Sequence, residues 1–357
     1  MNGAALLQLI KRISPKQVFF RASGLLIVIG ASLASIIILV FLLSQYPLMT
    51  LRYFFFGVFQ NLFYFGNMIN RAIPLMFTGL GITLAMKSSN FNLGGEGQVY
   101  AGAFTATVTA LALTAMGAFI GTVAALTAAA VTGGVMAGLS GFLKMKWKTN
   151  ELISSFLLSN AVVLVVNYLI TGPFKDPQTN LLATRRIAQE FRFDKILLPS
   201  NLSTGIYIAL VMVCIVYFYI YKTRSGYEMR MCGQNREFAR FGGLNVNTYI
   251  VLPMFLSGAL HGFGGAVAIF GTYHMGIKEF SAGMGWNGIS VALIARLNPL
   301  AVIPAALFFA YIESGASIAM LHSDVTFEIA SIVQSVIFFL VTAETIYSLA
   351  KGKRSLR

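Results

Sequence analysis

A polar, glycine-rich segment between two apolar runs is the first place where this sequence offers chemistry. Residues 90–98 (NFNLGGEGQ) hold three glycines and four polar side chains. Glycine lets the backbone leave helical geometry, and a broken helix at membrane depth is tolerated only where it lines a cavity or is packed by protein. We interpret Asn92, Glu96 and Gln98 as lining a solute path. The alternative is a tight cytoplasmic turn in which Glu96 stabilises the next helix through its N-terminal dipole.

A second glycine-rich break, 283–288 (GMGWNG), opens a short apolar run. Trp286 would stack on a flat solute ring or serve as an interfacial anchor. Asn287 would bond a solute hydroxyl or base edge, or cap the helix start. We place both residues on the solute path. Glu313 is a carboxylate inside another apolar run, which is a functional-site hypothesis by default, although pairing with a neighbouring helix explains it equally well.

No residue pattern in the sequence predicts catalysis or a metal site. The three histidines, His261, His274 and His322, have no Cys, Asp or Glu at metal-ligand spacing, and no HExxH or GxSxG signature occurs. We therefore expect no catalytic residues, no metal and no enzyme activity in this chain.

The elements that position these residues are membrane helices. Of the 357 residues, 57% are hydrophobic and 11% charged, and the mean hydropathy is +0.76, whereas ordinary soluble domains carry about 25% charged residues. We predict an all-α polytopic membrane bundle, and we interpret the aromatic stretch 53–67 as a separate interfacial helix. The ten predicted spans are 24–44, 70–86, 97–116, 118–141, 152–170, 204–221, 248–271, 285–297, 300–320 and 328–349.

The basic residues predict the orientation of these spans. The net charge is +14, and with both termini inside, eighteen basic residues fall on cytoplasmic segments and eight on outer segments, as the positive-inside rule requires. We therefore expect no nucleic-acid partner. The predicted parts are a cytoplasmic N-terminal segment 1–23, a transmembrane domain 24–349 and a cytoplasmic basic tail 350–357.

The longest predicted cytoplasmic loop, 222–247, is basic and interrupted by glycines. An amphipathic docking helix needs an apolar anchor with a charged rim, which Phe238 between Arg236 and Arg240 would supply; a solvated basic loop is the alternative. The chain has no GxxxxGK[ST] loop. Any ATP chemistry must come from another polypeptide.

Several ordered motifs resemble the inner-membrane permeases of bacterial ABC importers for simple sugars and nucleosides, above all the branch that works with basic-membrane-protein-type lipoproteins. Residues 91–98 are similar to the family's FNxGxEGQ, 149–155 (TNELISS) to TNEVIST, and 172–177 (GPFKDP) to the start of an external loop. Residues 287–300 (NGISVALIARLNPL) are similar to DGIAVALLGRNNPLG, with Asn287 where an acid is common.

The resemblance implies a role for residues 233–243 (GQNREFARFGG), which are similar to the family's GxNxxAAxxxGI coupling helix, with bulkier Phe238 at one of its paired alanines. It assigns ATPase coupling to Gly233, Asn235, Glu237, Phe238, Ala239, Arg240 and Gly243. It further implies a cytosolic ATPase that carries ATP and Mg, a second permease, identical or homologous, and an extracytoplasmic substrate-binding lipoprotein.

The resemblance implies nucleoside import across the inner membrane by alternating access, with no cofactor in this chain. A simple sugar such as ribose or galactose is the alternative solute. An ion-coupled secondary transporter is a rival class, which would be expected to carry paired intramembrane carboxylates or an inverted repeat; neither is clear in the sequence.

Overall fold

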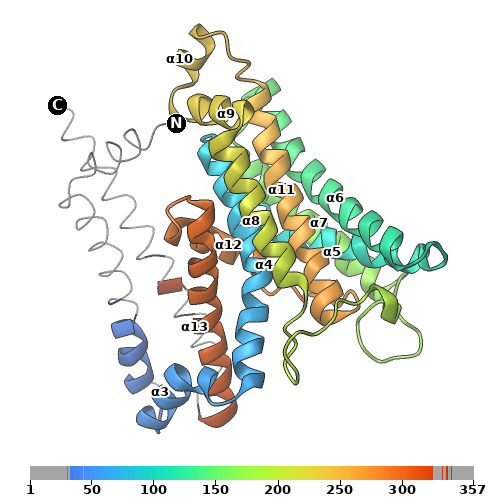
Figure 1. Cartoon of the computed structure of the whole chain (residues 1–357), viewed down its shortest axis with the longest axis vertical. Coiled ribbons are helices and arrows are strands. Elements are labelled where there is room, and N and C mark those ends of the chain that lie inside the picture. The colour runs from blue at the N-terminus through green and yellow to red at the C-terminus, as the bar shows by residue number, and fades with distance from the viewer. Residues whose placement is uncertain are drawn as a thin grey trace, which may run out of the picture. The chain divides into compact units, whose positions relative to one another are not determined.

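The computed structural model describes residue 30, residues 33–42 and 44–324, and positions 332, 335, 336 and 339. The chain divides into two compact units, one of residues 1–57 and 315–357 and one of residues Val58–Ser314. The predicted N-terminal segment 1–23, basic tail 350–357, span 328–349 and most of span 24–44 lie outside the described residues. All-helical architecture is confirmed for the part described, which contains no strand (Figure 1).

In the first unit, helix α3 (Pro47–Phe56) begins with Pro47, whose fixed φ suits the first helical turn. Ser44 and the Gln45 amide both bind the Asp324 carboxylate, at 2.7 and 2.5 Å. Tyr53 stacks on His322 with ring centroids 4.5 Å apart. These contacts join the segment before α3, and α3 itself, to the end of helix α13 (Val302–His322).

The second unit is built around helix α11 (Thr248–Ala268), which continues as a π-helical turn, Ile269–Tyr273. It packs on α4 (Leu62–Lys87), α5 (Gly95–Ala112) and α6 (Ala118–Trp147). Small residues allow this packing: a Cβ on Gly258 would collide with Gly133, and one on Gly262 with Ala129. Close backbone approach of this kind is how helices associate where no water drives them together.

Six helices of the described part are long and apolar enough to cross a membrane: Leu62–Lys87, Ala118–Trp147, Glu151–Thr171 (α7), Gly205–Lys222 (α8), Thr248–Tyr273 and Pro299–His322. They lie at predicted spans. Shorter apolar helices occur at Leu33–Leu42, Pro47–Phe59 and Met284–Ile294, the last being α12. The predicted interfacial helix 53–67 was wrong, because Asn61 caps a new helix by accepting a hydrogen bond from the Tyr64 amide at 2.8 Å, so α4 begins at Leu62.

Helix α4 has its two ends in different surroundings. The Asn67 side chain accepts a hydrogen bond from the Asn201 amide, in the loop 172–204 that follows α7. At the other end, Ser89 donates to the carbonyl of Gly233, in the last turn of α9 (Arg224–Gln234), which is followed by α10 (Arg236–Phe241). Twenty helical residues span about 30 Å, the thickness of a bilayer core. The loop 172–204 and the segment 222–247 therefore lie at opposite ends of the membrane helices of this unit.

Candidate functional site

The first break is a non-helical linker between α4 and α5. The chain leaves α4 at Ser88 and Ser89 and becomes helical again at Gly95. The buried amides of Asn92 and Gln98 bind each other reciprocally, at 2.7 and 2.9 Å. Asn92 also donates to Ser257 on α11 at 3.0 Å. These two predicted path residues therefore satisfy each other and fix the linker against α11, because buried polar groups need partners.

Glu96 joins the first break to the second. One oxygen of its carboxylate, Oε1, accepts hydrogen bonds from the Ser281 hydroxyl at 2.6 Å and the Gly283 amide at 3.0 Å; Oε2 accepts one from the Gly285 amide at 2.9 Å. Glu96 lies in the first turn of α5, and its amide donors are at the start of α12. A carboxylate between two helix N-termini is stabilised by both dipoles and by charge-assisted hydrogen bonds.

The two breaks touch directly through their glycines. A Cβ on Gly95 would lie 2.7 Å from the His261 ring and 3.0 Å from the Gly285 carbonyl oxygen, closer than a side chain tolerates. His261 is fully buried on α11, and its Nδ1 lies 2.7 Å from the Ser257 carbonyl oxygen. Only glycine fits at this crossing, so the composition of both breaks is set by the need for close backbone approach.

Trp286 and Asn287 lie on α12, directly after Gly285, whose amide binds Glu96. The half-buried Trp286 ring lies against Phe156 of α7, with centroids 5.7 Å apart and planes inclined at 59°. The Asn287 amide donates to the Glu313 carboxylate of α13 at 2.9 Å. The structure thus joins two residues that the sequence singled out separately, and Glu313 acquires the neighbouring-helix partner that was one of its two explanations.

The predicted coupling residues divide into two groups. Five of them are exposed: Asn235, Glu237, Arg240, Gly243 and Phe238, whose side chain is 62% exposed; Phe241 beside them is 92% exposed. Ala239 is buried, the Asn235 side chain caps α10 by accepting from the Phe238 amide, and a Cβ on Gly233 would collide with the Lys87 carbonyl. The exposed residues are therefore available to a partner, while Gly233 lies directly against the end of α4.

The segment 222–247 is also held by charge. Arg224 and Glu228 form an ion pair at 2.7 Å, one turn apart on α9. The hydrogen bond from Arg224, followed by one from Tyr249, lowers the pKa of the Glu228 carboxyl. Tyr249 lies in the first turn of α11 and donates to this carboxylate at 2.9 Å, so Glu228 joins α9 to α11.

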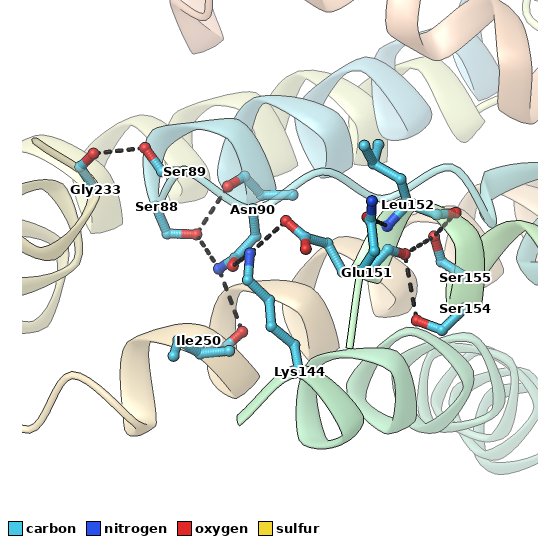
Figure 2. A network of polar contacts seen from close by, with 12 residues as sticks. Ser88, Ser89, Asn90, Lys144, Glu151, Leu152, Ser154, Ser155, Gly233 and Ile250 are labelled. Atoms are coloured by element: carbon cyan, nitrogen blue, oxygen red, sulfur yellow. Dashed lines mark hydrogen bonds and ion pairs between the residues drawn. The ribbon is translucent and has the colours of Figure 1, made fainter. Parts of the chain in front are cut away.

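A polar network connects the segment 222–247 to the first break (Figure 2). Arg236, the first residue of α10, donates to the Ser89 carbonyl at 3.0 Å and to the Asn90 side-chain oxygen at 3.1 Å. The Lys144 ammonium on α6 donates to the same oxygen at 2.9 Å and pairs with Glu151, the first residue of α7. One buried amide, Asn90, thus holds α4, α6 and α10 together.

Sequence reasoning missed Lys144 and Glu151 as members of this site. Lys144 was counted as one of the cytoplasmic positive charges, and Glu151 was noted only within the motif 149–155. A lysine at the end of an apolar run has a sufficient explanation in the positive-inside rule, so only its distance from Asn90 and Glu151 identifies it. The grouping of Asn90, Lys144 and Glu151 near three helix ends is therefore a finding of the structure.

Comparison with known proteins identifies the family. Residues 64–342 match the family "branched-chain amino acid transport system / permease component". The probable riboflavin import permease protein RfuC of Treponema pallidum is 36% identical, over 90% of this chain and 85% of its own length. The guanosine ABC transporter permease protein NupP of Bacillus subtilis is 29% identical, over 83% and 86%.

A third relative, the glucose ABC transporter permease protein TsgB13 of Haloferax volcanii, is 31% identical over 77% of this chain and 75% of its own length. No solved structure matches the chain at a significant level. Permeases of this family are not themselves catalytic, carry no cofactor, and work with an ATPase partner and other transporter subunits. The chain therefore belongs to the branched-chain amino acid transport system / permease component family and is a multi-pass membrane permease component of an ABC importer.

Proposed function

We propose that this permease imports a nucleoside across the cytoplasmic membrane of a bacterium by ATP-driven alternating access. Both termini are cytoplasmic, and the complex contains a cytosolic ATPase, a second permease and an extracytoplasmic substrate-binding lipoprotein. ATP binding closes the two ATPase domains, and this closure displaces the coupling segment 222–247. The displacement changes the membrane face from which a solute can reach the breaks at 90–98 and 283–288. The solute is carried across because its affinity for the transporter differs between the outward-open and the inward-open state.

The hydrogen bonds of Arg236 are the observation that carries this proposal. They connect α10, which exposes Phe238 and Phe241 to a partner, with Ser89 and Asn90, where the first break begins. Any displacement of α10 therefore acts on the start of the linker 90–94. The linker is in turn joined to α12 through Glu96, so one displacement reaches both breaks. Energetic coupling between α10 and the breaks is carried by elements that touch one another and can each adopt two arrangements.

Relatives support a hydroxylated solute. Permeases named for guanosine, nucleosides, riboflavin and glucose all align with this chain over two thirds or more of its length. These solutes share a polyhydroxylated portion, which amide and carboxylate side chains bind through hydrogen bonds. Trp286 and Asn287 would contact the solute at the second break, while Asn92, Glu96 and Gln98 would shape the path from behind it.

Riboflavin is the second candidate solute, and one observation favours it: the probable riboflavin import permease is 36% identical over 90% of the chain. Its flat ring system would use the same aromatic stacking as a nucleobase. A simple sugar such as glucose or ribose has no ring to stack and would depend on hydroxyl contacts alone. The three solutes can therefore be separated by direct competition.

The test is uptake by membrane vesicles that contain the whole transporter, with labelled guanosine as the solute and unlabelled riboflavin, glucose or ribose as competitors. We expect ATP-dependent accumulation of guanosine that unlabelled adenosine or guanosine suppresses and glucose does not. Accumulation of riboflavin but not guanosine would replace the proposed solute with the second candidate. Accumulation driven by an ion gradient without ATP would contradict the mechanism.

A further inference from the structure

Helix α7 carries a continuous row of exposed side chains along one face. The exposed positions recur every three or four residues, and the buried ones lie on the opposite face of the helix. The exposed residues, which we call the α7 stripe, are Ile153, Phe156, Leu157, Asn160, Ala161, Leu164, Val165 and Tyr168. The stripe is apolar except for the Asn160 amide and the Tyr168 hydroxyl near the end of the helix.

Asn160 makes the α7 stripe a poor surface for lipid. It lies near the middle of a 21-residue membrane helix, and its side chain donates one hydrogen bond, to the Phe156 carbonyl of the same helix at 2.9 Å. An amide side chain has two N–H donors and an acceptor oxygen. The second N–H group and the oxygen therefore have no partner among the described residues. Polar groups at this depth are costly in lipid and almost always face protein or a water-filled cavity.

The exposed faces of α6 and α8 are different in kind. On α8 the exposed residues are Tyr207, Leu210, Val211, Cys214, Ile215 and Phe218, and on the second half of α6 they include Val131, Val135, Leu139 and Phe142. Thr127, an exposed hydroxyl on α6, donates its only hydrogen to the Val123 carbonyl at 2.7 Å. Both faces therefore suit the hydrocarbon of a bilayer, whereas the α7 stripe does not.

The α7 stripe adjoins the second break. Phe156 packs on Trp286 with ring centroids 5.7 Å apart. Two to three turns further along α7, the side chain of Asn167 donates to the Glu279 carboxylate at 3.5 Å. The start of α12 and the residues before it therefore run beside α7, and Asn160 lies between these two contacts along the helix.

The depth and the chemistry of Asn160 indicate what covers the stripe. In many transporters the solute site lies near the bilayer midplane, where two halves of the molecule meet. Importers of this family work with other transporter subunits. An amide carries both donors and acceptors, so two amides that face each other satisfy one another, as Asn92 and Gln98 do in this structure. A like helix from a like subunit therefore completes the hydrogen bonds of Asn160, and interhelical amide bonds of this kind hold membrane helices together.

We infer that the α7 stripe is the surface that packs against the second permease subunit, beside the solute path, with Asn160 at the centre of the contact. The inference rests on the proposed function, in which the complex contains a second permease. It adds the surface that this subunit covers and the residue that binds it. A stripe that faced lipid would touch only acyl chains and would accept any apolar residue at position 160.

The experiment places the photoreactive residue p-benzoylphenylalanine at one position at a time. Leu157 and Leu164, about one turn on either side of Asn160, are the test positions. Val135 on α6 and Ile215 on α8 are the matched controls, since all four side chains are 54–70% exposed. Proteoliposomes that hold the complete transporter are irradiated, and adducts are identified by their mass and by sequencing of the joined peptides. ATP-dependent guanosine uptake is measured with the wild-type transporter in parallel.

We expect the two α7 positions to give an adduct of two permease chains in at least tenfold higher yield than the two controls, which should attach to lipid. A yield at the α7 positions no higher than at the controls would overturn the inference and leave nucleoside import intact. Adducts within a single chain, from α7 to residues 1–29 or 325–357, would overturn it as well. A wild-type transporter that accumulates no guanosine would contradict nucleoside import itself, whichever adducts form.

A second measurement does not depend on the probe. Asn160→Leu should lower guanosine uptake at least tenfold, because the amide of the facing subunit loses its partner, while Asn160→Gln keeps the amide and should retain most of the uptake. Thr127→Val is the matched control, since it removes an exposed polar group that also binds only its own helix among the contacts described, and its uptake should be unchanged. Wild-type uptake by Asn160→Leu would mean that this position faces lipid.

Discussion

Arg236 donates a hydrogen bond to the side-chain oxygen of Asn90 across 3.1 Å, and this contact joins helix α10 to the first residue of the linker between α4 and α5. The two residues are 146 positions apart in the chain. Lys144 donates to the same oxygen, so Asn90 is held from two sides by cations. The position of α10 and the position of the linker are therefore not independent.

Arg236→Ala should uncouple ATP hydrolysis from transport. The substitution removes both hydrogen bonds to Ser89 and Asn90, so α10 would move without displacing the linker. We expect the transporter to keep its ATPase activity and to lose at least tenfold in solute moved per ATP, measured in proteoliposomes. The control is Lys148→Asn, which removes an exposed charge at the same membrane face and suits the left-handed backbone there (φ 53°). Unchanged stoichiometry in Arg236→Ala would contradict the proposed route.

Replacement of both exposed phenylalanines of α10, Phe238→Ser and Phe241→Ser, should weaken the ATPase complex. Large aromatic anchors commonly contribute 2 kcal/mol or more to an interface, which corresponds to about 30-fold in affinity. Affinity purification of the tagged permease should recover less ATPase, while its own thermal stability in detergent stays the same. Leu181→Ser, at a 53% exposed residue of the loop 172–204 at the opposite end of the helices, is the control and should retain the ATPase. Full retention in the double variant would exclude α10 as the docking helix.

Glu96→Gln should destabilise the junction of the two breaks. The amide keeps one acceptor oxygen and places an NH₂ group against a donor, so at least one of Ser281, Gly283 and Gly285 loses its partner. A buried donor left unsatisfied costs about 1–3 kcal/mol, so the melting temperature of the purified complex should fall and transport should be lost. Glu190→Gln, at an exposed residue of the loop 172–204, changes the same chemical group and should have no effect. Wild-type transport by Glu96→Gln would argue against a role for this junction.

His274 should make the stability of the complex sensitive to acid. Burial, followed by the nearby charges of Arg192, Lys195 and Arg186, lowers the pKa of its imidazole below the ordinary value of 6.5. The unfolded chain then binds a proton more readily than the folded one. The stabilisation is therefore fully present above pH 6.5 and is lost as the pH falls below 6.5 toward the folded-state pKa.

The measurement is the melting temperature of the complex between pH 5 and pH 8 for wild type and His274→Asn. Asparagine tolerates the left-handed backbone at this position, where φ is 58°. The difference between the two curves isolates this histidine, and it should grow only on the acid side. Parallel curves would show that His274 does not titrate with folding.

The sequence alone was sufficient for the helices, because long apolar runs have one stable solution in a bilayer. It was also sufficient to mark both breaks, since glycines and amides interrupt apolar runs at 90–98 and 283–288. It could not show that the breaks meet, because Glu96 and Ser281 are 185 positions apart and no local rule pairs them. The boundary at Leu62 was missed although Asn61 is a favourable N-cap, because the aromatic residues around it suggested an interface.

For the side chains predicted to line the solute path, the sequence identified the residues but not their partners. Asn92 and Gln98 are polar residues in a break, but their mutual hydrogen bonds show that such residues also hold a linker in place. Asn287 and Glu313 were selected for different reasons, and the structure makes them one pair. The sequence can therefore identify a polar residue at membrane depth, while only the structure shows which partner it has.

The central claim is that the crossing of the two breaks changes its access between the two membrane faces when ATP is bound and hydrolysed. Ala282 lies between two of the groups that Glu96 binds, Ser281 and Gly283, and it is exposed. The direct measurement is the rate at which a membrane-impermeant maleimide modifies Ala282→Cys from each side of oriented vesicles, with Cys214 and Cys232 replaced by serine. We expect the faster side to reverse between the nucleotide-free and the vanadate-trapped transporter. Equal rates from the same side in both states would contradict the claim.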